Sequence, residues 1–73
     1  MVINISTIFE NMTMLYDEME RRIADRNNML IRDIGRYYDT TDNPDLKVIE
    51  AMSDQCDKDI AAIIREIENR MGE

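Results

Sequence analysis

The chain has 73 residues and a net charge of −7, with one Cys and no His. These counts exclude an internal disulfide and remove the commonest transition-metal ligand. The acidic balance argues against a general nucleic-acid-binding surface and against binding to an anionic membrane surface, whereas a basic protein partner remains compatible with it.

The first six residues, MVINIS, alternate β-branched and polar side chains. The sequence leaves open whether they form a short strand, continue a helix or stay disordered. They lack a basic n-region and a small-residue cleavage site, so we expect no signal peptide. No stretch approaches 18 consecutive apolar residues, so we expect no membrane span. Together with the lone cysteine, these features predict a cytoplasmic protein.

A long amphipathic helix follows. Apolar residues recur at intervals of seven, at Phe9, Tyr16, Ile23, Leu30 and Tyr37. This spacing keeps them on one side of a helix over five heptads. Neither Pro nor Gly interrupts residues 2–34, so nothing in the backbone forces an earlier stop. The pattern predicts one helix over about residues 7–38.

The start of this helix is predicted from its capping residues. Thr7 and Glu10 have the spacing of a capping box, in which two otherwise unpaired N–H groups are satisfied. We therefore place the first helical turn near Thr7. Asn4 and Ser6 are alternative caps further upstream.

Residues 39–43 are predicted to form the one loop, followed by a second helix over about residues 44–71. Asn43 and Pro44 suit the N-cap and first helical position, and Gly72 suits the end of the helix. Residues spaced by three and four form the inner stripe of this helix: Leu46, Ile49, Ser53, Cys56, Ile60, Ile63 and Ile67.

A loop this short makes the two helices antiparallel, so residues 1–73 are predicted to be one all-α domain, a two-helix hairpin. In the first half of the first helix the apolar face is about 120° wide, which is more than one neighbouring helix can cover. A monomer of this size is also marginally stable. The hairpin is therefore predicted to form a homodimer that is a four-helix bundle.

Two sets of residues are singled out as sites. The oligomer or partner interface is predicted at Ile5, Ile8, Phe9, Met12, Leu15, Tyr16 and Met19, where the first helix extends past the second. A polar layer of Arg26, Asn27, Ser53 and Cys56 is predicted near the middle of the hairpin, where Arg26 and Asn27 face Cys56 and Asp57. Such a layer can hold an ion or a small molecule, but setting the helix register is the favoured interpretation.

No catalytic residue, cofactor or metal ion is predicted, because no Ser or Cys has a base at catalytic spacing. The acids of the helices are interpreted as surface i,i+4 ion pairs, namely Asp17–Arg21, Glu18–Arg22, Asp54–Lys58 and Glu66–Arg70. The loop resembles an EF-hand in its oxygen ligands, but Pro44 stands where that motif requires Gly.

The sequence therefore predicts a small, acidic, non-enzymatic regulatory protein that binds itself and an unidentified macromolecular partner. One alternative is an inhibitor of phage or mobile-element origin that occupies a basic nucleic-acid-binding site through its acidic surface. The other is an RNA-binding bundle that uses an arginine face formed by Arg21, Arg22, Arg32 and Arg36.

Overall fold

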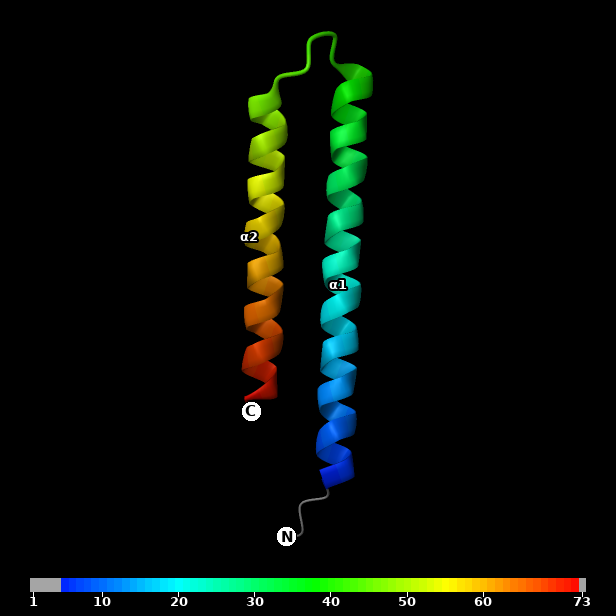
Figure 1. Cartoon of the computed structure of the whole chain (residues 1–73), viewed down its shortest axis with the longest axis vertical. Coiled ribbons are helices and arrows are strands. Elements are labelled where there is room, and N and C mark those ends of the chain that lie inside the picture. The colour runs from blue at the N-terminus through cyan, green and yellow to red at the C-terminus, as the bar shows by residue number, and fades with distance from the viewer. Residues whose placement is uncertain (1–4, 73) are drawn as a thin grey trace.

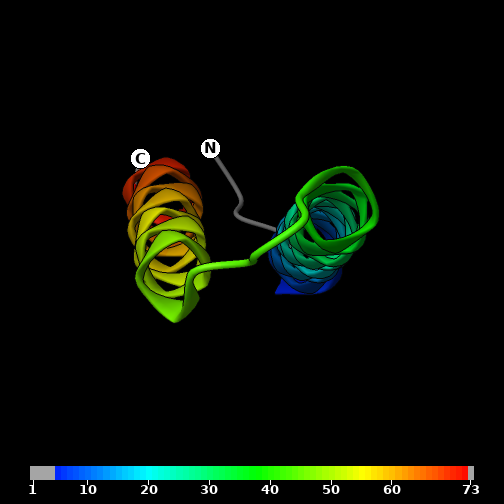
Figure 2. The same ribbon diagram turned by 90° about the horizontal axis from the view of Figure 1, so that it is seen from above.

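Two antiparallel helices lie side by side, and the first extends past the second at the end opposite the loop (Figure 1). The computed structural model describes residues 5–72, in which α1 spans Ile5–Thr40 and α2 spans Leu46–Met71. The view along the helix axes shows α1 and α2 next to one another, joined by the loop (Figure 2). The radius of gyration is 17.7 Å, against about 11 Å for a compact domain of this length. The predicted all-α hairpin is confirmed, and residues 5–72 contain no strand.

Helix α1 is continuous over 36 residues. Thr7 lies inside this helix, so the predicted capping box at Thr7 and Glu10 is wrong: the chain is already helical from Ile5. The conformation of residues 1–4, including the alternative cap at Asn4, lies outside the described residues. At the other end, the Thr40 hydroxyl donates a 2.7 Å hydrogen bond to the backbone oxygen of Arg36. The helix thereby ends two residues beyond the predicted position.

Helix α2 begins after Asp45, so the predicted start at Asn43 and Pro44 is wrong. Asp45 has an extended backbone, and its carboxylate accepts a 2.9 Å hydrogen bond from the N–H of Lys47. Its own N–H donates to the Tyr37 hydroxyl at 2.9 Å. The position of the N-cap therefore depends partly on Tyr37, a side chain of α1. Signals in the sequence near residues 43–45 do not show this contact.

Replacing Asp45 by Ala should lower the free energy of unfolding by about 1 kcal/mol, because the first turn of α2 loses its capping acceptor. Urea titration followed by circular dichroism measures this loss. Asp45→Asn is the matched control, since its amide oxygen can still accept from Lys47. Equal losses in the two variants would mean that the charge of Asp45, and not its capping bond, stabilises the helix.

The predicted register is confirmed at the middle of the hairpin. The Cys56 thiol donates to Asn27 Oδ1 at 3.7 Å and to the backbone oxygen of Arg26 at 4.0 Å. Folding the chain at its loop had placed these residues opposite one another. At the far end α2 stops at Met71, as predicted, and the N–H of Gly72 bonds to Glu68 O at 3.1 Å.

The core of the hairpin is very small. Among the side chains that the structure describes, only those of Cys56 and Ile67 are buried, with 1% and 0% of their surface exposed. The accessible surface is 5980 Å², whereas a compact monomer of 8.6 kDa would expose about 4,700 Å². Two helices in contact along a single seam leave most of each apolar face uncovered.

Candidate interaction surface

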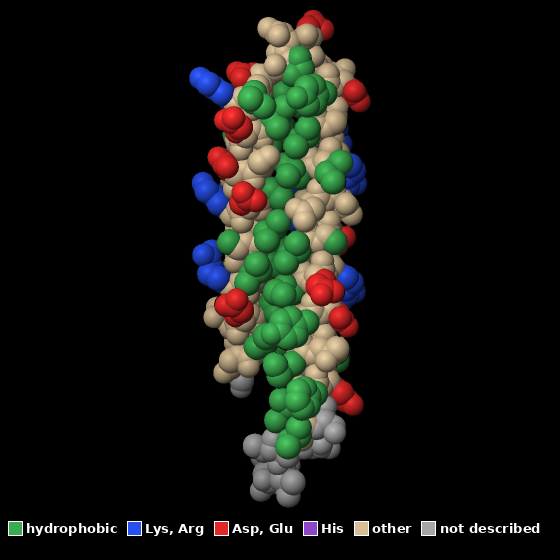
Figure 3. Space-filling view, viewed as in Figure 1, with side chains coloured by type: hydrophobic (Ala, Val, Ile, Leu, Met, Phe, Trp, Pro, Cys, Tyr) green, Lys and Arg blue, Asp and Glu red, His purple; other side chains and the backbone are tan. Residues whose placement is uncertain are grey.

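A continuous band of hydrophobic side chains runs along the groove between the helices and onto the free end of α1 (Figure 3). We call this band the apolar strip. At about 100° per residue, its members on each helix fall within a sector of about 60°. They are Ile5, Phe9, Met12, Tyr16, Ile23, Leu30 and Ile34 of α1 and Leu46, Ile60, Ile64 and Met71 of α2.

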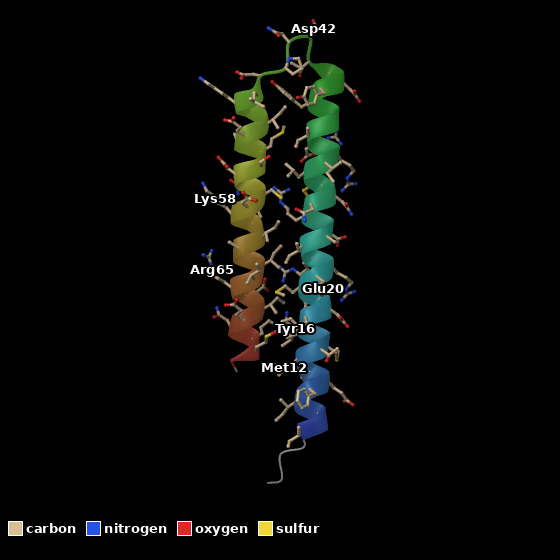
Figure 4. The ribbon with its side chains drawn as sticks, viewed as in Figure 1. Met12, Tyr16, Glu20, Asp42, Lys58 and Arg65 are labelled. Atoms are coloured by element: carbon tan, nitrogen blue, oxygen red, sulfur yellow. The ribbon has the colours of Figure 1, made fainter. Side chains whose placement is uncertain are left out.

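The free end of α1 carries the most exposed part of the strip. This end extends past the last turn of α2 (Figure 1). Ile5 is 67% exposed and Phe9 is 64% exposed. Met12 and Tyr16 lie next to the C-terminal end of α2, where they are also exposed (Figure 4). Large aromatic and aliphatic side chains held at a surface are the usual anchors of a protein interface.

The other predicted interface residues lie off this strip. Leu15 and Met19 are half-buried. They precede Arg22 and Arg26 by one heptad and so share their side of α1, the side that contacts α2. Ile8 points in the same direction, but it lies near the free end of α1 and stays 44% exposed. The structure thus brings Ile5, Phe9, Met12 and Tyr16 onto one surface and assigns Leu15 and Met19 to the seam between the helices.

Three ion pairs join the helices along the seam, each with a shortest N–O distance of 2.8 Å: Arg22–Glu66, Arg26–Asp59 and Arg70–Glu18. The prediction of i,i+4 pairs within each helix is wrong for these residues. Glu18, which was expected to pair with Arg22, binds Arg70 of α2 instead. Each of these charged groups pairs with a side chain of the antiparallel helix and not with the side chain one turn away on its own helix. The spacing of residues along one helix gives no information about the neighbouring helix.

The ion pairs lie to one side of the apolar strip. Arg22 is about 100° around α1 from Ile23, and Glu18 is about 160° around it from Tyr16. The hairpin therefore has two unlike sides. One side is hydrophobic and open, and the other is closed by charged contacts between its own helices.

The structure brings Arg26, Asn27 and Cys56 of the predicted polar layer together, but the main bond there involves a residue that sequence reasoning missed. Arg26 Nε donates to Asp59 Oδ2 at 2.8 Å, and Gln55 Nε2 donates to Asp59 Oδ1 at 2.9 Å. The spacing of Gln55 and Asp59, one turn apart, was the available signal. Arg26 Nη1 is buried without a hydrogen-bond partner among the described residues.

The remaining members of the layer differ in their surroundings. Cys56 is buried and Ser53 is half-buried, while Asn27 is exposed apart from its contact with the thiol. The Arg26–Asp59 ion pair and the two contacts of the Cys56 thiol join the helices at this level, which is compatible with a layer that sets helix register. Nothing in its geometry places a nucleophile next to a base.

The ion pairs shift the pKa values of the groups that form them. A hydrogen bond from Arg26 lowers the pKa of the Asp59 carboxyl, and a hydrogen bond from Gln55 adds a smaller effect in the same direction. A hydrogen bond from Arg22 lowers the pKa of Glu66 and raises the pKa of Arg22 itself. The hydrogen bond to Asp59 likewise raises the pKa of Arg26. All four groups stay charged near neutral pH.

These shifts predict an acid-sensitive fold. A carboxyl whose pKa is lower in the folded state contributes stability above its ordinary pKa, about 4, and this contribution is lost as the pH falls through the lowered value. The melting temperature should therefore fall between about pH 5 and pH 3. In the double variant Asp59→Asn, Glu66→Gln this fall should be shallower.

Thermal melts followed by circular dichroism across this pH range test the expectation. The control is Asp54→Asn, which removes an exposed acid that forms none of the three ion pairs. A double variant that melts with the same pH slope as the parent would contradict the assignment.

Residues 5–72 offer neither a membrane-spanning helix nor a metal-binding cluster. Neither helix is long and apolar enough to cross a membrane. No three His, Cys, Asp or Glu side chains in this range are grouped so that they could hold a metal ion. The chain matches no protein-family model, no curated protein and no solved structure.

Proposed function

We propose that this chain is a non-enzymatic association protein. Two hairpins pack through their apolar strips into a four-helix bundle, and the charged outer surface of that bundle binds a protein partner. The observation that supports this proposal is the exposed apolar strip on a hairpin in which, of the side chains described, only Cys56 and Ile67 are buried.

The amount of exposed surface supports self-association. Each hairpin exposes about 1,300 Å² more than a compact monomer of its mass would. Covering that excess on two copies would bury about 2,600 Å² in total, which is within the range of obligate homodimers, about 2,000–5,000 Å². Two helices per copy also match a four-helix bundle, in which each helix contacts two neighbours.

The charge of the outer surface supports a protein partner over RNA. A net charge of −7 per chain becomes −14 per dimer. Three arginines are already bound to carboxylates, and one of them, Arg22, belongs to the arginine face of the RNA-binding alternative. A basic protein is the partner that this surface attracts. An inhibitor that occupies a basic nucleic-acid-binding site is the narrower form of this proposal.

Light scattering at micromolar concentration tests the first part, because the dimer has twice the chain mass of 8.6 kDa. A monomeric mass would overturn the proposed bundle. Affinity capture of the tagged chain from host lysate tests the second part, with and without nuclease. A stoichiometric protein that is lost at high salt would support the proposal. Nuclease-sensitive RNA in its place would favour the RNA-binding alternative, and recovery of the chain alone would overturn the claim of a partner.

A further inference from the structure

From the length of α1 and the symmetry of its heptad line, Phe9, Tyr16, Ile23, Leu30 and Tyr37, we infer that the two copies associate in antiparallel orientation. The α1 helices would lie against one another, centred on Ile23, so that the free end of each covers the loop end of the other. The inference rests on the proposed dimer and adds its orientation and register.

The first supporting feature is the spacing of the heptad line. Reversing α1 about Ile23 places Phe9 opposite Tyr37 and Tyr16 opposite Leu30, while Ile23 meets its own copy. Every position of the line thus meets an apolar side chain. In an antiparallel pair of identical helices, the numbers of two facing residues always add up to the same value. Only a pair centred on Ile23 brings all five residues of this line opposite one another.

The second feature is the length of α1. The helix spans Ile5–Thr40, so its midpoint lies between residues 22 and 23. An antiparallel pair centred on Ile23 therefore has its two ends flush. Ile5, which is 67% exposed, would then lie beside the end of the partner helix, close to Tyr38, which is 52% exposed. The apolar pattern and the described extent of α1 give centres within half a residue of each other.

The alternative dimer leaves the free ends uncovered. If both hairpins point the same way, each α1 faces the partner's α2, which has 26 residues against 36 in α1. The longer helix then projects by up to about 15 Å at the open end. Phe9, 64% exposed, would have no facing helix there. In the antiparallel arrangement, the loop end of α1 in the second copy covers Phe9.

Helix α2 is compatible with the same centre. In the observed register Cys56 faces Asn27, so Ile60 lies level with Ile23. An α2 pair centred on Ile60 places Ile49 opposite Met71 and Ile60 opposite its own copy. All three residues are half-buried in the single hairpin, so they retain surface to contribute.

Distances between spin labels, one on each copy, test the orientation. Labels are attached to the full chain at a new cysteine, in a Cys56→Ala background or, if that unfolds, in Cys56→Ser. The label sites are Asp39→Cys and Glu10→Cys, which are exposed and turned away from the apolar strip, and Ala24→Cys near the centre. At 1.5 Å per residue, an antiparallel dimer centred on Ile23 separates the Asp39 labels by about 48 Å along the axis and the Glu10 labels by about 39 Å.

The Ala24→Cys label separates failure of this inference from failure of the proposed dimer. A short distance at that site, with long distances at the two end sites in the expected order, supports the inference. Distances below about 30 Å at all three sites would show a parallel dimer and overturn the orientation alone. Long end distances that imply another midpoint would overturn the centre at Ile23. Absence of any dipolar coupling in all three folded variants would overturn the dimer itself.

Discussion

Replacing Ile67 by Ala should destabilise the protein by about 3 kcal/mol, which lowers the melting temperature by about 12–24 °C for a domain of this size. Ile67 has 0% of its surface exposed and is the larger of the two buried residues. Its truncation removes apolar contact and leaves a cavity that two rigid helices cannot close. Urea denaturation at a fixed protein concentration measures the change in free energy.

The matched control for this variant is Ile31→Ala, which makes the same chemical change on a side chain that is 66% exposed. We expect it to cost less than about 1 kcal/mol, because little apolar surface leaves water at this position. Equal losses at the two positions would mean that the seam between the helices is not where the hairpin obtains its packing energy.

Replacing Phe9 and Tyr16 together by Ser should weaken self-association by at least about 100-fold. Both rings belong to the exposed apolar strip, and aromatic residues that anchor an interface commonly contribute about 2 kcal/mol or more each. In a homodimer every substitution acts twice, so the losses combine. Sedimentation equilibrium over about 1–100 µM measures the dissociation constant, using about 1.4 kcal/mol per tenfold change.

Met14→Ser provides the comparison for that double variant. Met14 is 68% exposed, but it lies away from the apolar strip, so its loss should leave the dissociation constant within about threefold. If Met14→Ser weakens association as strongly as the double variant, the contact surface is not the one proposed. If neither variant changes the mass, the strip is not an interface between copies.

The hairpin and its register could be predicted from the sequence because they depend on periodic features. The heptads of α1 and the three-four spacing of α2 specify which faces meet, and the short loop fixes their direction. Asn27 opposite Cys56 follows from folding the chain at that loop, and the structure confirms it. Periodic signals of this kind survive small errors in the position of any single residue.

The caps and ion pairs could not be predicted, because each depends on a side chain from the other helix. The N–H of Asp45 is held by the Tyr37 hydroxyl, eight residues away, and Arg26 finds Asp59 across the seam. Of the candidate site, the exposed residues Ile5, Phe9, Met12 and Tyr16 were predicted together. The separation of Leu15 and Met19 from them needed the direction of α2, which one helical projection does not give.

The scarcity of buried residues also has a consequence for the life of the protein in a cell. When folding and dimerisation are coupled, the folded fraction rises with abundance, so a freshly diluted or newly made chain is more open to proteases than a concentrated one. Of the side chains described, Cys56 and Ile67 alone are buried. An isolated hairpin with so small a core opens easily and is therefore cleaved easily. The amount of the chain would then help to determine its lifetime, and activity would begin above a threshold of synthesis.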